Sequence, residues 1–427
     1  MSESERMACG VHPPPDGGSP FAAVQAAWRF FSNPRIDLPQ LAQPLIACAR
    51  RGALEACEEW LLDVLDWSLL HYNGHAGKAD RSSLGCKNDL GYDLLTALLL
   101  SDRDGGPLAP ACLDLRAADG THSTRSPAVL PAPSRLDGLT EVIEHVEGLN
   151  LGRRLVHIID READSVGHFR QWESKGRFFL VRADDNRRVL HDGRSCRLGA
   201  VADRMRREGR LARARPVRYQ HQEAFQWLAE TTVVLDRPAH RHRVVQGKAR
   251  HVIVPGEPIP VRLVVSEIRT AQGRVLARWL LLSNLPGTVP AATIALWYYW
   301  RWRIESYHKL LKSAGHQVEH WQQETAEAVA RRLAVAAMGA VVVWRLARDE
   351  RPAAAEMRDV LIRLSGRQMK RGPKARGFTE PALLVGLGVL VAMLGLSEQY
   401  DLPALRALTA RTLPCILHAL AVRRESG

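Results

Sequence analysis

Hydrophobic and polar positions in the first half of the chain predict strands first and a helix after them. The runs WLLDVLDWSLLHY (60–72), GYDLLTALLLSDRDG (91–105) and ACLDLRA (111–117) are rich in strand-forming residues. A helical stretch, LTEVIEHVEGL (139–149), and a buried-strand run, RRLVHIID (153–160), come next. Three strands, a helix and a fourth strand predict an α/β domain.

The second half of the pattern predicts a β-rich insertion between helical regions. A helix is expected over READSVGHFRQWES (161–174) and a strand over RFFLVRAD (177–184). From about residue 187 to 285 strand-like pieces dominate, namely RARPVRYQ, FQWLAETTVVLD, PVRLVVSEI and RWLLLSN. Helices follow over YYWRWRIESYHKLLKS (298–313) and AVARRLAVAAMGAVVVWRLAR (328–348), and the remainder reads as α-helical. Together with the first half, this order predicts a ribonuclease-H-like fold with a β-rich insertion.

Charge and cysteine usage favour a polyanionic partner in a reducing compartment. The 427 residues include 59 Lys and Arg against 46 Asp and Glu, a net charge of +13, and such a balance is typical of nucleic-acid-binding proteins. Seven scattered cysteines form no Cys-x-x-Cys or Cys/His cluster, which indicates a reducing cytosol and no structural zinc. The first 20 residues lack the apolar core of a signal peptide. The apolar run PALLVGLGVLVAMLGL (381–396) is short and interrupted by glycine, so we expect a buried helix and no membrane span.

One stripe on the helix over 298–313 carries candidate chemistry. At about 100° per residue, the four members of the stripe fall at roughly 0, 300, 340 and 320° around the axis: Tyr298, Arg301, Glu305 and Lys312. A single carboxylate among phosphate-type donors has two interpretations. Glu305 is either the ion-pair partner of a neighbouring arginine, or a metal ligand beside a polyanion.

Two aspartates stand where strand ends would place them. Asp66 closes the run LLDVLD and Asp160 closes RRLVHIID, so both carboxylates are expected at the rim of neighbouring strands. Each aspartate alone is as well explained by a turn or a helix cap. Together with Glu305 they supply hard oxygen ligands, which Mg²⁺ prefers.

Two motifs resemble the signatures of a known family. IIDREADSVGHF around Asp160 resembles the Asp-Arg-Glu-Ala-Asp signature of the insertion-sequence-four family of DDE transposases. The four residues of the stripe resemble that family's Tyr-two-Arg-three-Glu-six-Lys signature. The similarity runs from about residue 26 to about residue 345. It implies a ribonuclease-H-like catalytic domain in which Asp66, Asp160 and Glu305 are catalytic and bind two Mg²⁺ ions, with Mn²⁺ as an expected substitute.

The resemblance also implies DNA contacts and a reaction. In this family the 3′-hydroxyl freed by a first nick attacks the opposite strand to form a DNA hairpin, which is reopened before strand transfer. Trp279 matches the aromatic on which the family stacks a flipped base. The residues expected to bind DNA are Tyr298, Arg301, Lys312, Trp279 and Arg161. The implied partners are double-stranded DNA, as transposon ends and target, and a second copy of the chain, in a bacterial cytoplasm and associated with the nucleoid.

The same resemblance divides the chain into regions. We expect a disordered leader (1–20), a helical entry segment left from an N-terminal DNA-binding region (21–58), a catalytic domain in two parts (59–186 and 286–348), a β-rich insertion (187–285), and a C-terminal helical region for dimerisation (349–427).

Three functions remain open on the sequence alone. The first is an active cut-and-paste transposase. The second is a shortened, non-catalytic regulator that dimerises with a full-length transposase and inhibits it, which the short segment before residue 26 favours. The third is a nuclease without strand transfer, which the family signatures and Trp279 disfavour. Retention of all three acids and of the basic stripe favours the enzyme.

Overall fold

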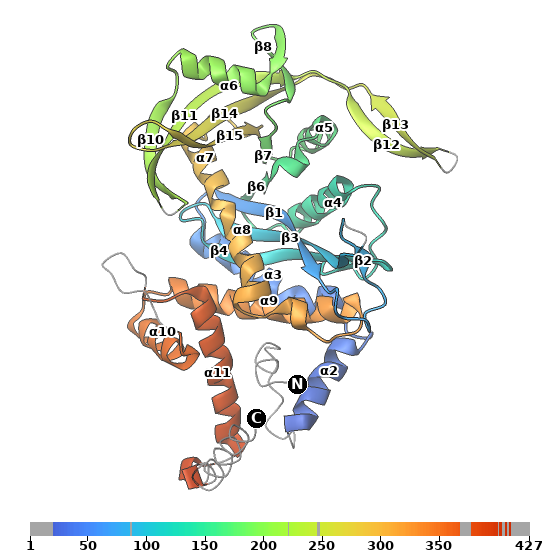
Figure 1. Cartoon of the computed structure of the whole chain (residues 1–427), viewed down its shortest axis with the longest axis vertical. Helices are drawn as coiled ribbons and strands as arrows, with labels where there is room; N and C mark the ends of the chain where they lie inside the picture. Colours follow the sequence, from blue (N-terminus) through green and yellow to red (C-terminus); the bar gives the residue numbers. More distant parts are fainter. Residues whose placement is uncertain are drawn as a thin grey trace, which may run out of the picture.

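The computed structural model of the chain describes residues 20–85, 88–220, 222–245, 248–367, 377–399 and 401–403, together with residues 406, 407 and 410. Residues 1–19 of the expected leader lie outside this part, as does most of the chain beyond residue 399. The described residues form a mixed α/β structure with one large sheet and helices around it (Figure 1).

The large sheet has 13 strands. Its order is β5-β4-β3-β1-β6-β7-β15-β14-β11-β8-β9, with β10 beside β11 and β2 beside β3, while β12 and β13 form a separate two-stranded sheet. The strands are β1 Trp60–His71, β2 Ser82–Ser83, β3 Leu90–Ser101, β4 Pro107–Ala117, β5 Gly120–Ser123, β6 Arg154–Ile159, β7 Phe179–Ala183, β8 Arg188–His191, β9 Arg194–Arg197, β10 Ala212–Tyr219, β11 Gln222–Leu235, β12 Ala239–Val245, β13 Lys248–Val254, β14 Ile259–Arg269 and β15 Val275–Ser283.

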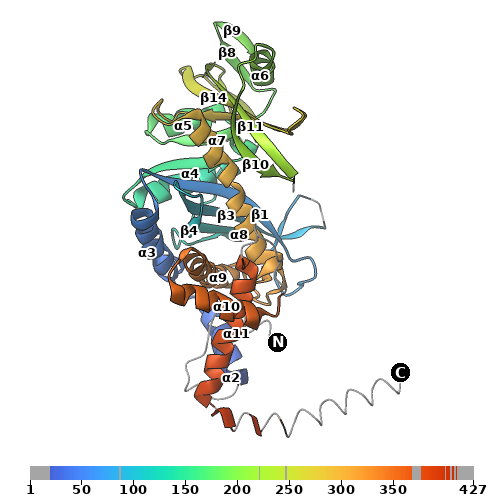
Figure 2. The same ribbon diagram turned by 90° about the vertical axis from the view of Figure 1, so that its left-hand side faces the viewer.

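Helices cover the sheet and extend beyond its lower end. In two views at right angles, α9 lies below β4, and α2 and α11 lead away from the sheet (Figures 1 and 2). The helices are α2 Pro20–Ser32, α3 Leu38–Ala56, α4 Arg135–Gly148, α5 Val166–Ser174, α6 Leu198–Arg207, α7 Ala291–Trp300, α8 Trp302–Lys309, α9 Ala326–Arg348, α10 Pro352–Ser365 and α11 Glu380–Gln399. Single turns are η1 Arg161–Ala163, η2 Leu310–Ala314, which is a π-turn, and η3 Val318–His320.

The predicted strands and helix of the first half are present in the predicted order. β1 pairs antiparallel with β3 and parallel with β6, β3 pairs antiparallel with β4, and β6 pairs parallel with β7. Near-continuous burial of the side chains of β3, of β4 and of the first six residues of β1 explains why these runs lack a strict alternation. In the β1–β6 register Leu65 lies opposite Ile159, so the two residues that follow, Asp66 and Asp160, lie next to each other.

The turn before β1 sets the end of the helical entry segment that was expected over 21–58. Helix α3 ends at Ala56, because the next backbone N–H groups, those of Glu58, Glu59 and Trp60, donate to the carboxylate of Asp102 at 2.8, 3.1 and 2.9 Å. The same β3–β4 loop holds Gly105 at φ +64°, where an added Cβ would lie 2.2 Å from the ring of Trp300. Only glycine fits this close approach to the end of α7.

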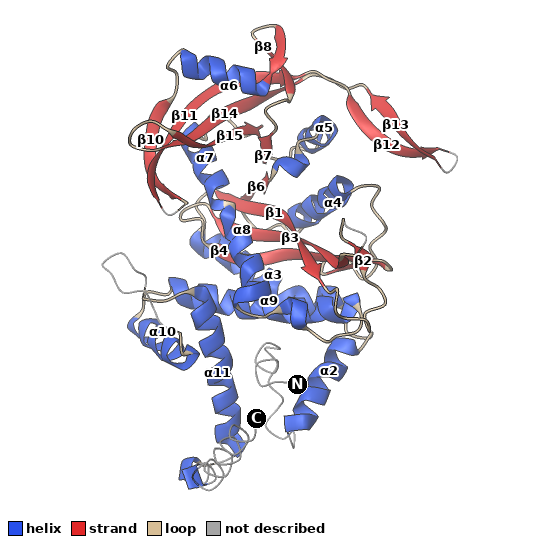
Figure 3. Ribbon diagram, in the orientation of Figure 1, coloured by secondary structure: helices blue, strands red, loops and turns tan. Residues whose placement is uncertain are grey.

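The β-rich insertion is present, with one helix that the sequence pattern missed. The four predicted pieces lie in β10, β11, β14 and β15, and β15 pairs with β7, so that the insertion extends the same sheet (Figure 3). Helix α6 was not predicted. Three arginines among its ten residues conceal its short apolar face, which includes Leu198, Val201 and Met205, all buried.

Two other helix predictions need correction. The stretch 161–174 is a 3₁₀ turn, Arg161–Ala163, followed by α5 from Val166, because Ser165 and the preceding residue leave the helical conformation. The run 381–396 lies in α11, as expected for a helix, but Met393 and Leu394 are exposed, so it is not fully buried. No helix in the described ranges is long and apolar enough to cross a membrane.

Candidate active site at the end of β6

The helix expected over 298–313 is divided at the site. Tyr298 lies in α7, Arg301 forms the junction, Glu305 lies in α8, and Lys312 lies in the π-turn η2. At the junction the N–H of Arg301 donates to the carbonyl of Tyr298 at 3.1 Å, a tighter turn than an α-helix makes. The assumption of one regular helix was therefore wrong, and it affects where Lys312 points.

Arg301 brings the three predicted acids together. Its Nη1 lies 3.1 Å from Oδ2 of Asp66 in β1. Its Nη2 lies 2.9 Å from Oε1 of Glu305 and 3.6 Å from Oδ2 of Asp160, which follows β6. The guanidinium is 5% exposed, whereas the side chains of Asp66, Asp160 and Glu305 are 21, 32 and 42% exposed. This acidic trio (Asp66, Asp160 and Glu305) thus opens to solvent above a buried cation.

Burial and mutual repulsion shape the electrostatics of the acidic trio. Burial raises the pKa of Asp66 to about 6; Arg301 and the N–H of Trp67 oppose the rise, and Asp160 and Glu305 add to it. Burial disfavours the charge of Arg301, but Tyr298 and the acidic trio outweigh that effect and raise its pKa. One guanidinium therefore serves three carboxylates, and the group carries an excess of negative charge.

The acidic trio has the donor chemistry of a divalent-cation site. Its carboxylate oxygens are the hard ligands that Mg²⁺ and Mn²⁺ take. With Arg301 between the acids, no three Asp, Glu, His or Cys side chains in the described ranges are spaced as metal ligands. Arg301 itself is incompletely bonded, because its buried Nε has no hydrogen-bond partner there. The carboxylates have the chemistry of metal ligands, and the guanidinium of Arg301 takes the space between them.

The other predicted DNA-binding residues lie around the acidic trio in different states. Tyr298 is 2% exposed, and burial raises its pKa to about 12. Nζ of Lys312 donates to the carbonyl of Leu69 at 2.6 Å and lies 3.2 Å from Oε1 of Glu319, so it does not join the acidic trio. Arg161 is 57% exposed and lies 3.5 Å from Asp184.

Trp279 is largely enclosed. It is 5% exposed, and its ring lies 6.3 Å from that of Tyr219 and 5.9 Å from that of Tyr298. The aromatic series Tyr219, Trp279 and Tyr298 leads from the insertion to Arg301, which lies 5.8 Å from the ring of Tyr298. At this exposure the ring of Trp279 is not open to a DNA base in the present conformation.

The sequence pattern did not reveal the partners of two acidic residues that follow Asp160. Asp164 receives Nε of Arg187 at 2.8 Å and the N–H of Asp184 at 3.0 Å, which ties the turn after β6 to the end of β7. Arg135 lies 3.2 Å from Glu162 and 3.1 Å from Asp93. Charged residues inside a signature gave a signal for Asp164 and Glu162, but no sequence pattern indicates their partners.

A second missed group lies on β1 and β6, three residues before each aspartate. Nδ1 of His157 lies 2.8 Å from Oδ2 of Asp63, and its Nε2 lies 3.1 Å from Oε1 of Glu147 in α4. Burial opposes protonation of His157, but both acids raise its pKa to about 9. A charged pair at matched positions of two apolar strands was the available signal, since Asp63 pairs with His157 in the register.

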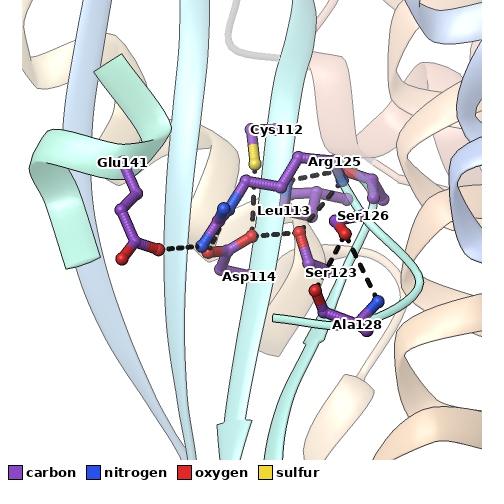
Figure 4. Close-up of polar contacts among 9 residues, drawn as sticks. Cys112, Leu113, Asp114, Ser123, Arg125, Ser126, Ala128 and Glu141 are labelled. Carbon is purple, nitrogen blue, oxygen red and sulfur yellow. Dashed lines mark hydrogen bonds and ion pairs between the residues drawn. The ribbon is translucent and has the colours of Figure 1, made fainter. Parts of the chain in front are cut away.

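A third group, the Arg125 cluster, joins β4 and β5 to α4 (Figure 4). Nε of Arg125 lies 3.1 Å from Oδ2 of Asp114, and its Nη2 lies 2.7 Å from Oε2 of Glu141. Asp114 also accepts from the hydroxyl of Ser123 and, at 3.3 Å, from the thiol of Cys112. Arg125 and Asp114 are 13 and 7% exposed, whereas Glu141 is 42% exposed, so the arginine and the strand acid are buried and only the helix acid faces solvent.

Comparison with known proteins identifies the segment that carries two of the three acids. Residues 133–341 match the family model described as Transposase DDE domain. The matched segment contains Asp160, Glu305 and the β-rich insertion, and Asp66 lies before it. No curated protein matches the chain.

Proposed function

We propose that this chain, which is a DDE transposase and therefore a metal-dependent DNA-cleaving enzyme, carries out cut-and-paste transposition through nicking, hairpin formation and strand transfer at transposon ends. The observation that carries the proposal is the convergence on Arg301 of three acids from β1, the end of β6 and α8. The same convergence favours an enzyme over a non-catalytic regulator, because a regulator has no need of three acids in one place.

The proposed fold of the catalytic part is ribonuclease-H-like, specific to the insertion-sequence-four family. Its support is the strand sequence β4-β3-β1-β6-β7, in which the first three strands are antiparallel and the last two run parallel to β1. This arrangement places Asp66 beside Asp160 and leaves α8 to supply Glu305. The proposed catalytic parts are residues 59–186 and 286–348, with the insertion over 187–285.

The proposed cofactor is a pair of Mg²⁺ ions, for which Mn²⁺ substitutes, held by Asp66, Asp160 and Glu305. When bound, such ions stabilise charge on the attacking and leaving oxygens of phosphoryl transfer. The three carboxylates are partly exposed, so they would hold the ions on the side of the site that a phosphodiester reaches from solvent. The 3.1 Å contact of Arg301 with Asp66 keeps the most buried acid of the trio aligned before substrate binds.

The proposed substrate contacts are phosphates beside the scissile bond. Arg161, 57% exposed beside Asp160, is accessible to a phosphate without rearrangement. Lys312 is 24% exposed, and it would bind a phosphate by giving up its ion pair with Glu319. Tyr298 contributes by supporting Arg301, because its own side chain is buried.

Trp279 is proposed to receive the flipped base during hairpin formation. Stacking of a base on an aromatic contributes about 1 to 3 kcal/mol, which corresponds to a rate effect of roughly ten- to a hundredfold. Trp279→Ala should slow hairpin formation by this factor and leave the first nick nearly unchanged, and Trp279→Phe, which keeps an aromatic ring in the enclosed position, should recover part of the rate. A gel that resolves nicked from hairpin DNA measures both; equal loss of the two products would assign Trp279 to the core alone.

The proposed assembly is a homodimer on paired double-stranded DNA ends, acting in the bacterial cytoplasm at the nucleoid. Support for a protein partner comes from the region after Asp349. Exposed apolar side chains lie on α10 and α11, namely Met357, Val360, Met393 and Leu394. A second copy of this region would cover them.

A cleavage assay with single substitutions tests the proposal. Asp66→Asn, Asp160→Asn and Glu305→Gln should each abolish Mg²⁺-dependent nicking of a transposon-end duplex while DNA binding persists, because loss of one ligand disrupts the two-ion geometry. Glu162→Gln is the matched control: it lies in the same signature but pairs with Arg135, away from Arg301, and should nick normally. Full nicking by any trio variant would remove that acid from the site, and an inactive unmodified chain that inhibits an active transposase would favour the regulator.

A further inference from the structure

We infer that Arg301 is the resident cation of the acidic trio when metal is absent, and that metal binding moves its guanidinium from the acids to a DNA phosphate. The inference rests on the proposed metal site. It assigns to Arg301 two successive partners, so that the protein cannot bind a phosphate through this residue until metal has displaced it.

The first partner is defined by geometry. Nη1 and Nη2 of Arg301 lie 2.9 to 3.6 Å from one oxygen of each acid, which is the space a cation shared by the three carboxylates must take. Two divalent ions bound by the same oxygens would face this guanidinium at close range, and like charges repel strongly in a partly buried site. Metal and Arg301 therefore exclude each other from the trio.

A route out of the trio is present. The guanidinium carbon lies 5.8 Å from the ring of Tyr298 on the buried side and 5.7 Å from the ring of Trp302, which is 46% exposed. A rotation toward Trp302 keeps a cation–π contact while it brings the charge to the surface. The buried Nε, which has no hydrogen-bond partner in the described ranges, loses nothing in this rotation.

The exchange orders the binding events. Without metal the trio and Arg301 together carry a net charge of about −2 when all groups are ionised, so the site repels a phosphodiester. With two divalent ions the local charge becomes positive, and the released guanidinium adds a bidentate phosphate donor. Metal should thus increase DNA affinity in part through Arg301, and DNA should increase metal affinity by the same factor.

Chemical modification of the unmodified full-length protein tests the movement directly. Phenylglyoxal reacts with accessible guanidinium groups, and mass spectrometry of proteolytic peptides locates the modified arginine. Without metal, Arg301 should react about tenfold more slowly than Arg303, and saturating Mn²⁺ without DNA should remove most of this difference. Arg303 is the internal control, because it is half-buried, lies two residues away and forms no ion pair among the described side chains.

Affinity for Mn²⁺, measured by calorimetric titration, provides the second test. Arg301→Gln removes the competing charge and should bind Mn²⁺ about tenfold more tightly than the unmodified protein. Lys309→Gln, which removes an exposed charge from the same helix, should bind it with nearly unchanged affinity. If Arg301→Gln does not fold, the modification experiment still decides.

The outcomes separate this inference from the proposed function. Mn²⁺ binding that Asp160→Asn abolishes, with Arg301 protected equally before and after metal, would overturn the exchange and leave the metal site standing. Absence of Mn²⁺ binding by the unmodified protein would overturn both. Release of Arg301 by Mn²⁺ in the unmodified protein but not in Asp160→Asn would support both.

Discussion

The acidic trio and the Arg125 cluster contain the same kinds of side chain and lie on the same sheet, but they differ in which of their groups are buried. Each places one arginine between carboxylates from a strand and a helix. In the Arg125 cluster the strand acid, Asp114, is 7% exposed and is saturated by Arg125, Ser123 and Cys112. At the other site the arginine is the most buried member and the acids face solvent.

The balance of charge differs between the two groups, and this difference favours a structural role for the Arg125 cluster and a binding role for the acidic trio. Arg125 has two carboxylate partners, and further donors complete Asp114, so the cluster has no reason to bind anything else. Arg301 has three partners, its Nε is unsatisfied, and the pKa of Asp66 is raised to about 6. A buried ion pair is weak evidence for a site, whereas an excess of exposed carboxylates around a buried cation supports the site proposed at the acidic trio.

Removing one acid from each group should give the largest contrast in stability. Asp114→Ala leaves Arg125 buried beside a half-exposed glutamate, and such losses cost about 3 to 5 kcal/mol. Asp160→Ala should change the free energy of unfolding by less than about 1 kcal/mol, because Asp160 is 32% exposed and Arg301 keeps two other partners. Urea denaturation measures both, and equal losses would mean that the acidic trio is a structural cluster as well.

The pH dependence of stability should distinguish the trio next. Because the folded-state pKa of Asp66 is raised from 3.8 to about 6, the folded protein holds this proton more tightly than the unfolded chain. In the metal-free protein, stability should therefore fall as pH rises from about 4 to about 6, by at most about 3 kcal/mol. Above pH 6 this contribution is constant.

The measurement compares urea denaturation of the unmodified protein and Asp66→Asn at pH 4, 5, 6 and 7 without metal. The substitution removes the titrating group, so the difference in unfolding free energy between the two proteins should change across this range. The same comparison with Glu162→Gln, an exposed acid outside the trio, should give a nearly constant difference. A constant difference for Asp66→Asn too would show that its carboxyl titrates normally.

Sequence predicted the strand order and the acids, because both depend on local pattern. Apolar runs of strand length gave β1, β3, β4 and β6, and Asp66 and Asp160 were located from their positions in those runs. The register that places Leu65 opposite Ile159 brings the two aspartates side by side, but Asp66 lies in the middle of β1, Trp60–His71, and not at the strand end that was predicted. The roles of these residues in metal binding stay predictions.

Features that depend on tertiary packing could not be predicted. A regular helix was assumed over 298–313, but the contact of Trp300 with Gly105 and the junction at Arg301 divide it. The resemblance predicted that Arg301 contacts a phosphate. Its ion pair with Glu305 was one of the two interpretations of the stripe, but its contacts with Asp66 and Asp160 could not be predicted, since they require β1, the end of β6 and α8 to meet. Burial of Trp279 likewise depends on Tyr219, which lies 60 residues earlier in another strand.

Substitution of Lys312 should have the smallest effect, because this residue has structural partners, as Arg125 has, and is also partly exposed, as the acids of the trio are. Its Nζ donates to the carbonyl of Leu69 and forms an ion pair with Glu319. Oε1 of Glu319 also accepts a hydrogen bond from the N–H of His71 at 2.9 Å, so Lys312 and Glu319 together hold the end of β1. Lys312→Gln should lower the free energy of unfolding by about 1 kcal/mol. If the lysine also meets a phosphate, the slope of log affinity against log salt should fall by about one. Lys309→Gln, exposed one turn earlier, controls for general loss of charge. A weaker fold with an unchanged salt slope would make Lys312 an anchor for β1 alone, and would leave Arg301 and Arg161 as the phosphate-binding residues of this surface.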